Sequence, residues 1–203
     1  MIHVHDLKAG LPIFKCLSSP IRIEILELLQ EMGPLGMTEI AEKAHVSKVS
    51  IYNFFESKDN LRRIIIMNML DESIAKIKEL IEKEGDFFAK IEQYIQIRTW
   101  YYGQYSLRFF FEAVESDPEL RNYFDHYNTA NKELFIKFIA AGKHSAVFAQ
   151  DVSDTAIGIY LDMIQSYFLH NKEIRNQLEH NPELVRQLNV LFLDGLIQQK
   201  NRK

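Results

Sequence analysis

The chain has 203 residues, of which 47% are hydrophobic and 26% are charged, and this composition is typical of a folded globular protein. It contains only 8 glycines and 5 prolines, too few for the frequent turns of a sandwich or barrel, so we expect an all-α fold. The net charge of −4 does not exclude a nucleic-acid partner, because a small basic patch on an acidic protein can still bind phosphate.

Several functional classes are disfavoured by what the sequence lacks. The single cysteine, Cys16, cannot form an internal disulfide. His3 and His5 have no third ligand nearby, so we expect no metal site. No apolar run approaches the roughly 20 residues that cross a bilayer, and the N-terminus has no signal-peptide layout. Phosphate loops, nucleophile elbows and zinc-protease motifs are also missing. We therefore expect a cytoplasmic protein with no membrane partner, no cofactor and no enzymatic activity.

Apolar residues at helical spacing predict nine helices, and three of them begin where a capping residue precedes proline, at Ser19-Pro20, Asp117-Pro118 and Asn181-Pro182. Gly142 is expected to end one of the long helices. The short N-terminal helices follow one another too closely to fold separately, and we expect them to share the helix from residue 58 with the larger C-terminal part. The expected ranges are about 20–32, 37–44, 48–55, 58–83, 87–103, 106–115, 118–141, 153–170 and 182–199.

Residues 37–61 read MTEIAEKAHVSKVSIYNFFESKDNL, a pattern that predicts a helix, a turn of about four residues at His45–Lys48, and a second helix. The apolar residues of the first helix can pack on Ile51 and Phe55, which leaves the polar side of the second helix outward. Ser47 and Ser57 are placed to cap the helices that follow them, where free backbone N–H groups suit a DNA phosphate.

This segment resembles the helix-turn-helix of the tetracycline-repressor-like (TetR) family, whose signature is similar to "IA..AGVSKGTLYxHFxSKxxL"; here IAEKAHVSKVSIYNFFESKDNL has the same spacing. His45 stands where the family commonly has a turn glycine, a position that often needs a positive φ. Val49 replaces a small residue, and Gly36 stands where the family often has threonine. The resemblance implies a DNA-binding domain at 1–65 and a helical domain at 66–203 that binds a ligand and dimerises.

The resemblance also implies a function and its residues. The chain would be a homodimeric regulator, most simply a repressor, that binds a palindromic double-stranded DNA operator and is released by a small-molecule inducer. Tyr52 and Lys58 would contact phosphate, and Lys48, Ser50 and Asn53 would lie nearest the bases or the backbone. The full set of DNA-binding candidates is Thr38, Ser47, Lys48, Ser50, Tyr52, Asn53 and Lys58.

Two aromatic stripes in the C-terminal half, each interrupted by one polar residue, are candidates for a largely apolar inducer pocket. Arg98 and Asn131 are the interrupting residues and could contact the ligand, although an internal salt bridge or a buried hydrogen bond explains them equally well. The candidate pocket residues are Tyr94, Arg98, Trp100, Tyr101, Tyr105, Phe109, Phe110, Phe124, Tyr127, Asn131 and Phe138.

The last two predicted helices each carry an apolar stripe, and four such helices from two chains would form a bundle at a dimer interface. The candidate interface residues are Ile157, Leu161, Ile164, Phe168, Leu184, Leu188, Leu191 and Gly195.

Two rival functions remain: a helical protein-interaction adaptor that has lost DNA binding, and a helical enzyme that uses the aromatic cavity.

Overall fold

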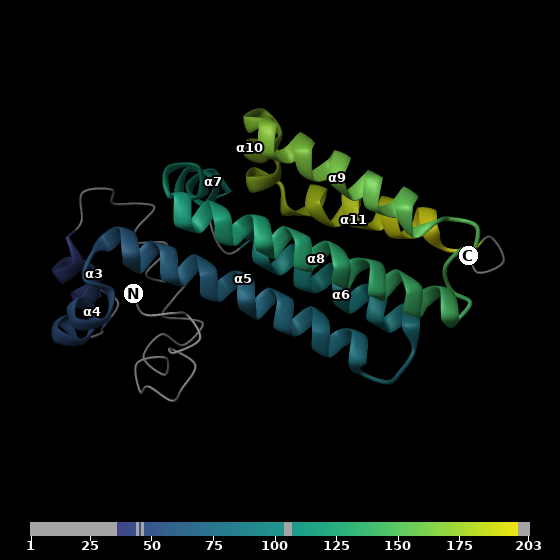
Figure 1. Ribbon diagram of the computed structural model, residues 1–203, viewed down its shortest axis with the longest axis horizontal. Coiled ribbons are helices and arrows are strands. Elements are labelled where there is room, and N and C mark those ends of the chain that lie inside the picture. Colours follow the sequence, from purple (N-terminus) through teal and green to yellow (C-terminus); the bar gives the residue numbers. More distant parts are fainter. Residues whose placement is uncertain (1–35, 44, 46, 104–106, 199–203) are drawn as a thin grey trace. The chain divides into compact units, whose positions relative to one another are not determined.

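The computed structural model describes residues 36–43, 45, 47–103 and 107–198, and these residues form nine α-helices and no strand (Figure 1). The chain divides into two compact units, Met1–Ile65 and Ile66–Lys203, with the boundary inside one helix, α5. The predicted helix at 20–32 lies outside the described residues. The helices are α3 (Met37–Lys43), α4 (Lys48–Phe55), α5 (Lys58–Glu82), α6 (Phe87–Gly103), α7 (Leu107–Ser116), α8 (Pro118–His144), α9 (Asp154–His170), α10 (Lys172–His180) and α11 (Pro182–Leu196).

The helix starts marked by proline in the described part of the chain are confirmed. The buried Asp117 carboxylate accepts hydrogen bonds from the backbone N–H groups of Glu119, at 3.0 Å, and Leu120, at 3.1 Å. The Asn181 side chain accepts from the backbone N–H of Leu184 at 3.2 Å. Each side chain satisfies N–H groups that the first turn of a helix leaves unpaired, so these helices begin where their caps are.

Two helix ends differ from the prediction, and both differences arise from packing around Phe148. Gly142 does not end α8, which continues to His144; it is buried, and a Cβ there would lie 2.2 Å from Cδ2 of Phe148. Glycine is required here for a close contact and not for a turn. Helix α11 stops at Leu196 because Ile197 pairs with Phe148 in an isolated antiparallel bridge.

Helix α10 was missed by the sequence analysis because its sequence, KEIRNQLEH, is almost entirely polar. It starts at the cap residue Asn171 and buries the side chain of Arg175, which is 5% exposed. The Arg175 guanidinium lies 4.5 Å from the ring centroid of Phe111, pairs with Glu115 at 3.5 Å and donates to the backbone oxygen of Phe168 at 3.1 Å. One arginine thus joins α10 to α7 and to the end of α9.

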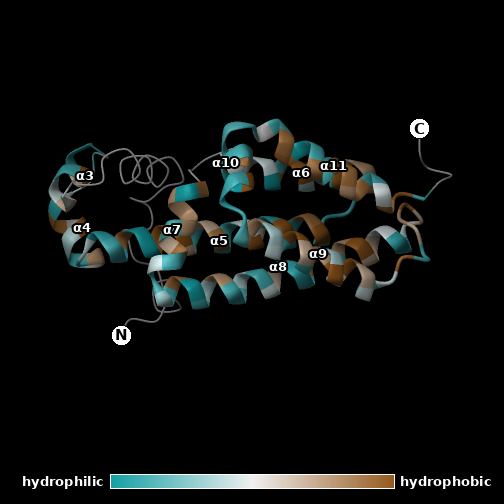
Figure 2. Ribbon diagram, turned by 90° about the horizontal axis from the view of Figure 1, so that it is seen from above, coloured by the Kyte–Doolittle hydropathy of each residue, from teal (hydrophilic) through white to brown (hydrophobic). Residues whose placement is uncertain are grey.

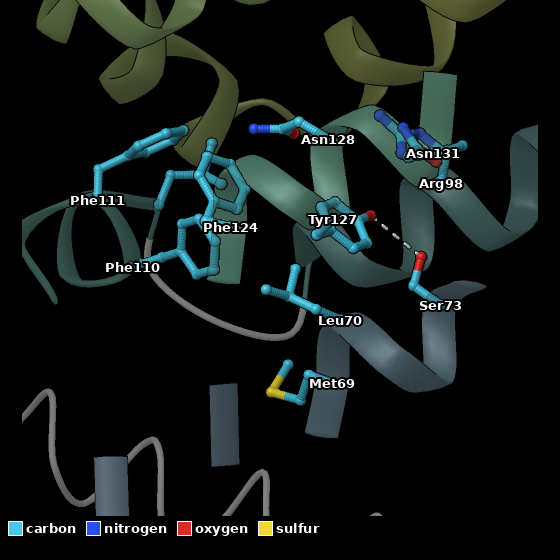
Figure 3. Close-up of a pocket in the computed structure, with 11 residues that line it drawn as sticks. Met69, Leu70, Ser73, Arg98, Phe110, Phe111, Phe124, Tyr127, Asn128 and Asn131 are labelled. Carbon is cyan, nitrogen blue, oxygen red and sulfur yellow. Dashed lines mark hydrogen bonds between the residues drawn. The ribbon is translucent and has the colours of Figure 1, made fainter. Parts of the chain in front are cut away.

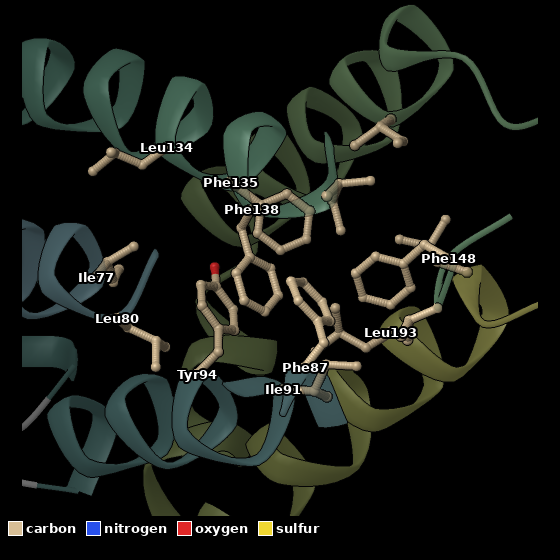
Figure 4. Close-up of a cluster of buried hydrophobic side chains, with 14 residues drawn as sticks. Ile77, Leu80, Phe87, Ile91, Tyr94, Leu134, Phe135, Phe138, Phe148 and Leu193 are labelled. Carbon is tan, nitrogen blue, oxygen red and sulfur yellow. The ribbon is translucent and has the colours of Figure 1, made fainter. Parts of the chain in front are cut away.

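The core of the second unit is an aromatic cluster to which α5, α6, α8, α9 and α11 all contribute (Figure 4). The ring of Phe138, which is fully buried, stacks on Phe87 and on Tyr94, each with centroids 5.0 Å apart. Phe148 meets Phe87 edge-on at 5.4 Å. Such stacked and edge-to-face pairs add stability beyond burial alone, so this cluster fixes the mutual positions of the long helices.

Candidate functional site

The two helices of the predicted helix-turn-helix, α3 and α4, pack through an apolar seam. Ile40 and Ala41 of α3 are fully buried, and Ile51 and Phe55 of α4 are 2% and 4% exposed. These are the positions that the sequence pattern assigned to the inside of the motif.

The turn between α3 and α4 has the backbone expected at the glycine position of the motif. His45 has φ = 54°, in the left-handed region that costs energy for a residue with a Cβ. A second left-handed residue, Glu56 with φ = 56°, leads into α5. There the Ser57 hydroxyl accepts a hydrogen bond from the backbone N–H of Asn60 at 3.1 Å, which confirms Ser57 as a helix cap.

The outer side of α4 carries the candidate DNA-binding residues. Lys48 and Asn53 are exposed, and Val49 and Tyr52 are 68% and 44% exposed. Ser50 belongs to α4, but its side chain lies outside the described residues. Helix α4 therefore presents a mixed polar and apolar surface of the kind that reads base edges in the major groove.

Polar contacts brace this surface against α3. The hydroxyl groups of Thr38 and Tyr52 lie 3.4 Å apart, and the ammonium of Lys48 pairs with Glu42. Residues 36–65 contain five basic and four acidic side chains, so the described motif is close to neutral. Of the other candidates, Ser47 is exposed and Lys58 is half-buried.

A cavity of about 100 Å³ lies within the second unit, lined by residues of α5, α6, α7 and α8 (Figure 3). Five of the predicted pocket residues line it: Arg98, Phe110, Phe124, Tyr127 and Asn131. The lining also includes six residues that were not predicted, namely Met69, Leu70, Ser73, Leu107, Phe111 and Asn128.

The remaining pocket candidates lie elsewhere. Tyr94 and Phe138 belong to the aromatic core, and the half-buried Phe109 is not among the lining residues. The side chains of Trp100 and Tyr101, and all of Tyr105, lie outside the described residues.

The cavity has an aromatic end and a polar end. The rings of Phe110, Phe111 and Phe124 meet edge-to-face, with centroids 5.3 to 6.2 Å apart. At the other end Arg98 and Asn131 lie next to each other, and Tyr127 stands between the two ends (Figure 3). The arrangement suits a small molecule with an apolar body and a polar head.

A half-buried phenol joins two of the helices that line the cavity. Tyr123 of α8 donates a hydrogen bond to Asp71 of α5 at 2.5 Å. Burial, followed by the hydrogen bond and the charge of Asp71, raises the pKa of the Tyr123 phenol well above its ordinary value. The phenol therefore stays protonated and keeps α8 bonded to α5.

Comparison with known proteins identifies the family. Residues 25–63 match the family model described as bacterial regulatory proteins of the tetR family. The chain is a TetR-family transcriptional regulator. No curated protein sequence matches it at a significant level.

Solved structures of TetR regulators share the fold along nearly the whole chain. PfmR from Thermus thermophilus is 19% identical with a TM-score of 0.55, over 88% of this chain and 96% of PfmR. A TetR regulator from Haloarcula marismortui is 16% identical with a TM-score of 0.60, over 89% and 100%. FadR from Bacillus subtilis, solved in complex with stearoyl-CoA, is 15% identical with a TM-score of 0.56, over 85% and 98%.

The cavity residues of this TetR regulator that sequence reasoning missed carried only weak signals. Ser73 is a polar residue on the buried side of α5, and its hydroxyl lies 3.4 Å from that of Tyr127. Asn128 lies three residues before Asn131, on the same side of α8. Both signals were visible, but only the packing of α5 on α8 shows that these side chains share one cavity.

The last long helices of the regulator, α9 and α11, lie side by side, with Tyr160 stacked on Phe192 at 4.8 Å (Figure 1). Of the interface candidates, Leu188 and Leu191 are 39% and 71% exposed, and Gly195 is also exposed. Ile157 is buried in the core, whereas Leu161, Ile164, Phe168 and Leu184 are half-buried.

Helix α9 has a further apolar face that the sequence stripe did not include. It exposes Ile159, Tyr160, Met163 and Tyr167, each between 44% and 64%. Hydrophobic colours are correspondingly more frequent along α9 than along the first turns of α8 (Figure 2). None of the described helices is long and apolar enough to span a membrane.

Proposed function

We propose that this TetR-family chain is a homodimeric repressor that binds a palindromic operator and is released when a small, largely apolar inducer fills the cavity of the second unit. The observation that carries the proposal is the exposed side of α4, where Lys48, Tyr52 and Asn53 face outward and two of them are braced by α3. A surface held in this way loses little side-chain freedom when it meets DNA.

In the proposed complex Tyr52 and Lys58 bind phosphates, while Lys48, Ser50 and Asn53 lie nearest the bases. Thr38 and Ser47 complete the contact set. Most of the affinity comes from phosphate contacts, which fix the register of α4 on the duplex, and the sequence preference comes from the few side chains at the base edges.

A dimer is required because a palindrome presents two equivalent half-sites. The exposed apolar residues of α9 and α11 support an interface there, since four helices from two copies would bury them together. Leu191, at 71% exposure, and Met163, at 64%, are the most exposed large apolar residues of these two helices. We place the interface on this face, with Leu188 and Gly195 beside them.

The inducer site is the cavity lined by α5, α6, α7 and α8. Its three phenylalanines supply an apolar wall, and Arg98 and Asn131 supply polar contacts. FadR from Bacillus subtilis, which shares the fold, was solved in complex with stearoyl-CoA, and this supports regulation of the present chain by a small molecule. The inducer must bind one conformation of the dimer more tightly than the other, because equal affinity would leave DNA binding unchanged.

In the proposed function the protein acts in the cytoplasm, where bacterial DNA lies, and catalyses no reaction. The two rival functions differ from it in what they would show. A protein-interaction adaptor would have no salt-dependent affinity for DNA, and an enzyme would convert the compound that fills its cavity.

The test is selection of tight binders from a random DNA library, followed by affinity measurements over a range of salt concentrations. We expect a palindrome whose binding weakens steeply with salt, and weaker binding by Lys58→Ala. The control is Lys78→Ala, which changes an exposed lysine of α5 in the second unit. Failure to enrich any DNA sequence would refute the proposal.

A further inference from the structure

Val49 is an exposed apolar side chain on the helix that we place on DNA. It is 68% exposed, whereas Ile51 and Phe55 of the same helix are 2% and 4% exposed and form the seam with α3. Valine is also a weaker helix former than most residues, so Val49 stabilises neither the core of the motif nor α4 itself. Exposure alone assigns no role to such a residue, but its position does.

Val49 belongs to the part of α4 that meets base edges in the proposed complex. It is the second residue of the helix, which begins at Lys48, and in helix-turn-helix proteins the N-terminal residues of the second helix contact the bases. Tyr52 and Asn53 follow three and four residues later, so they lie on the same side of α4, and both are exposed. Val49 is therefore continuous with the DNA-binding surface.

The chemistry of the major groove restricts what this side chain can read. The edges of guanine, cytosine and adenine offer hydrogen-bond donors and acceptors, which a valine cannot pair, and thymine alone adds an apolar C5-methyl group. Contact with this methyl group removes two apolar surfaces from water. Contact with a polar edge would instead desolvate that edge without giving it a hydrogen bond. A valine at this position therefore favours thymine over the other bases.

The side chain is also held in a way that suits a specific contact. A β-branched residue in a helix has one strongly preferred χ1 angle. Its neighbours are braced by α3, since Lys48 pairs with Glu42 and the hydroxyl groups of Tyr52 and Thr38 lie 3.4 Å apart. Little side-chain freedom is lost on contact. The polar residues around Val49 argue against a protein partner, because a specific protein interface needs a larger apolar centre.

We infer that Val49 contacts the C5-methyl group of one thymine in each half-site of the operator and selects for that base. This inference rests on the proposed function in one respect, namely that α4 lies in the major groove of the operator. The thymine occupies one fixed position in the half-site, because the phosphate contacts of Tyr52 and Lys58 fix the register of α4 on the duplex.

The test removes the methyl group from the DNA and leaves the rest of the operator intact. In the palindrome selected from the random library, each thymine is replaced in turn by deoxyuridine, which keeps the hydrogen-bonding edge of thymine. The affinity of the full-length protein for each duplex is measured by fluorescence anisotropy. We expect one position in each half-site at which the replacement weakens binding about fourfold, a difference of about 0.8 kcal/mol, and about 16-fold when both half-sites are changed. A half-site without thymine, or without a thymine that is sensitive to this replacement, would overturn the inference.

The variant Val49→Ala then assigns the methyl contact to this residue. Alanine favours the helix, so the variant should fold, and the same replacement of thymine should now weaken binding less than about twofold for one half-site. The matched control is Phe88→Ala, which removes another exposed apolar side chain, 41% exposed on α6, and should keep the fourfold loss. An undiminished fourfold loss in Val49→Ala would overturn the inference. Complete loss of DNA binding by this variant would also overturn it, because the contact inferred here leaves the phosphate contacts in place.

The same experiment distinguishes failure of this inference from failure of the proposed function. If the library yields no DNA sequence that the protein binds, the proposed repressor is refuted and the methyl contact with it. A protein that binds its palindrome with salt-dependent affinity but is indifferent to every thymine methyl group refutes only the contact at Val49.

Discussion

The buried glycine of α8 provides a sharp test of the core. In Gly142→Ala the new methyl group would lie 2.2 Å from Cδ2 and 2.6 Å from Cε2 of Phe148, and 2.7 Å from Cε1 of Phe87. Neither ring has room to retreat, because Phe148 is fully buried and packs on Phe87 and Phe138. The backbone of α8 or the Phe148 segment must therefore move.

The expected magnitude follows from two opposing effects. Alanine is favoured over glycine in a helix interior by about 1 kcal/mol. Overpacking a tight core typically costs about 1–3 kcal/mol, and two rings at such short distances place Gly142→Ala at the upper end or beyond. We expect a net loss of about 2 kcal/mol, which for a protein of this size lowers Tm by about 4–8 °C.

Thermal unfolding followed by circular dichroism measures this change, and Gly158→Ala in α9 is the matched control. The methyl group at residue 158 would meet only the flexible end of Lys132, at 3.4 Å, so this variant should gain about 1 kcal/mol from helix propensity. If Gly142→Ala were stabilised as much as Gly158→Ala, the packing described around Phe148 would be wrong.

Three other predictions concern DNA contacts, assembly and pH. Tyr52→Phe and Lys58→Ala should weaken binding to all DNA sequences alike, as measured by fluorescence anisotropy. Lys58→Ala should also lower the slope of log affinity against log salt concentration by roughly one unit. A loss of affinity confined to one base position would argue against phosphate contacts. Leu188→Glu combined with Leu191→Glu should give monomers in sedimentation velocity, because two charges would enter the proposed interface; a persistent dimer would place the interface elsewhere. The raised pKa of the Tyr123 phenol contributes stability that is fully present below the ordinary phenol pKa of about 10 and is lost as pH rises through the raised value. Tyr123→Phe should therefore flatten the alkaline fall in the free energy of unfolding measured with urea, and an unchanged pH profile would contradict the half-buried hydrogen bond to Asp71.

The parts of the fold that the sequence predicted correctly are those determined by neighbouring residues. Asp117 and Asn181 begin helices because each side chain bonds to backbone only two or three residues away. The left-handed turn at His45 was likewise predictable from the spacing of the motif. Such local interactions leave a pattern that can be recognised along the chain.

The parts that were missed depend on contacts between distant residues. The end of α11 depends on the pairing of Ile197 with Phe148, and Gly142 lies inside α8 because Phe148 packs against it. The polar helix α10 is stabilised by Arg175, whose partners lie on α7 and α9. In the cavity, Arg98 and Asn131 were predicted because they interrupt aromatic stripes. Ser73 of α5 also lines the cavity, but it was not predicted, because its place there depends on tertiary packing.

Hydroxyl-radical footprinting of the selected DNA duplex, with the number of bound protomers measured on the same complex, tests the central claim most directly. The account predicts two protomers and two symmetric protected regions, centred about one helical turn of about 34–36 Å, or a multiple of it, apart. Lys58→Ala should weaken both regions equally. A single protected region with one protomer, or protection that Lys58→Ala and Tyr52→Phe leave unchanged, would contradict recognition of a palindrome by α4 of a homodimer.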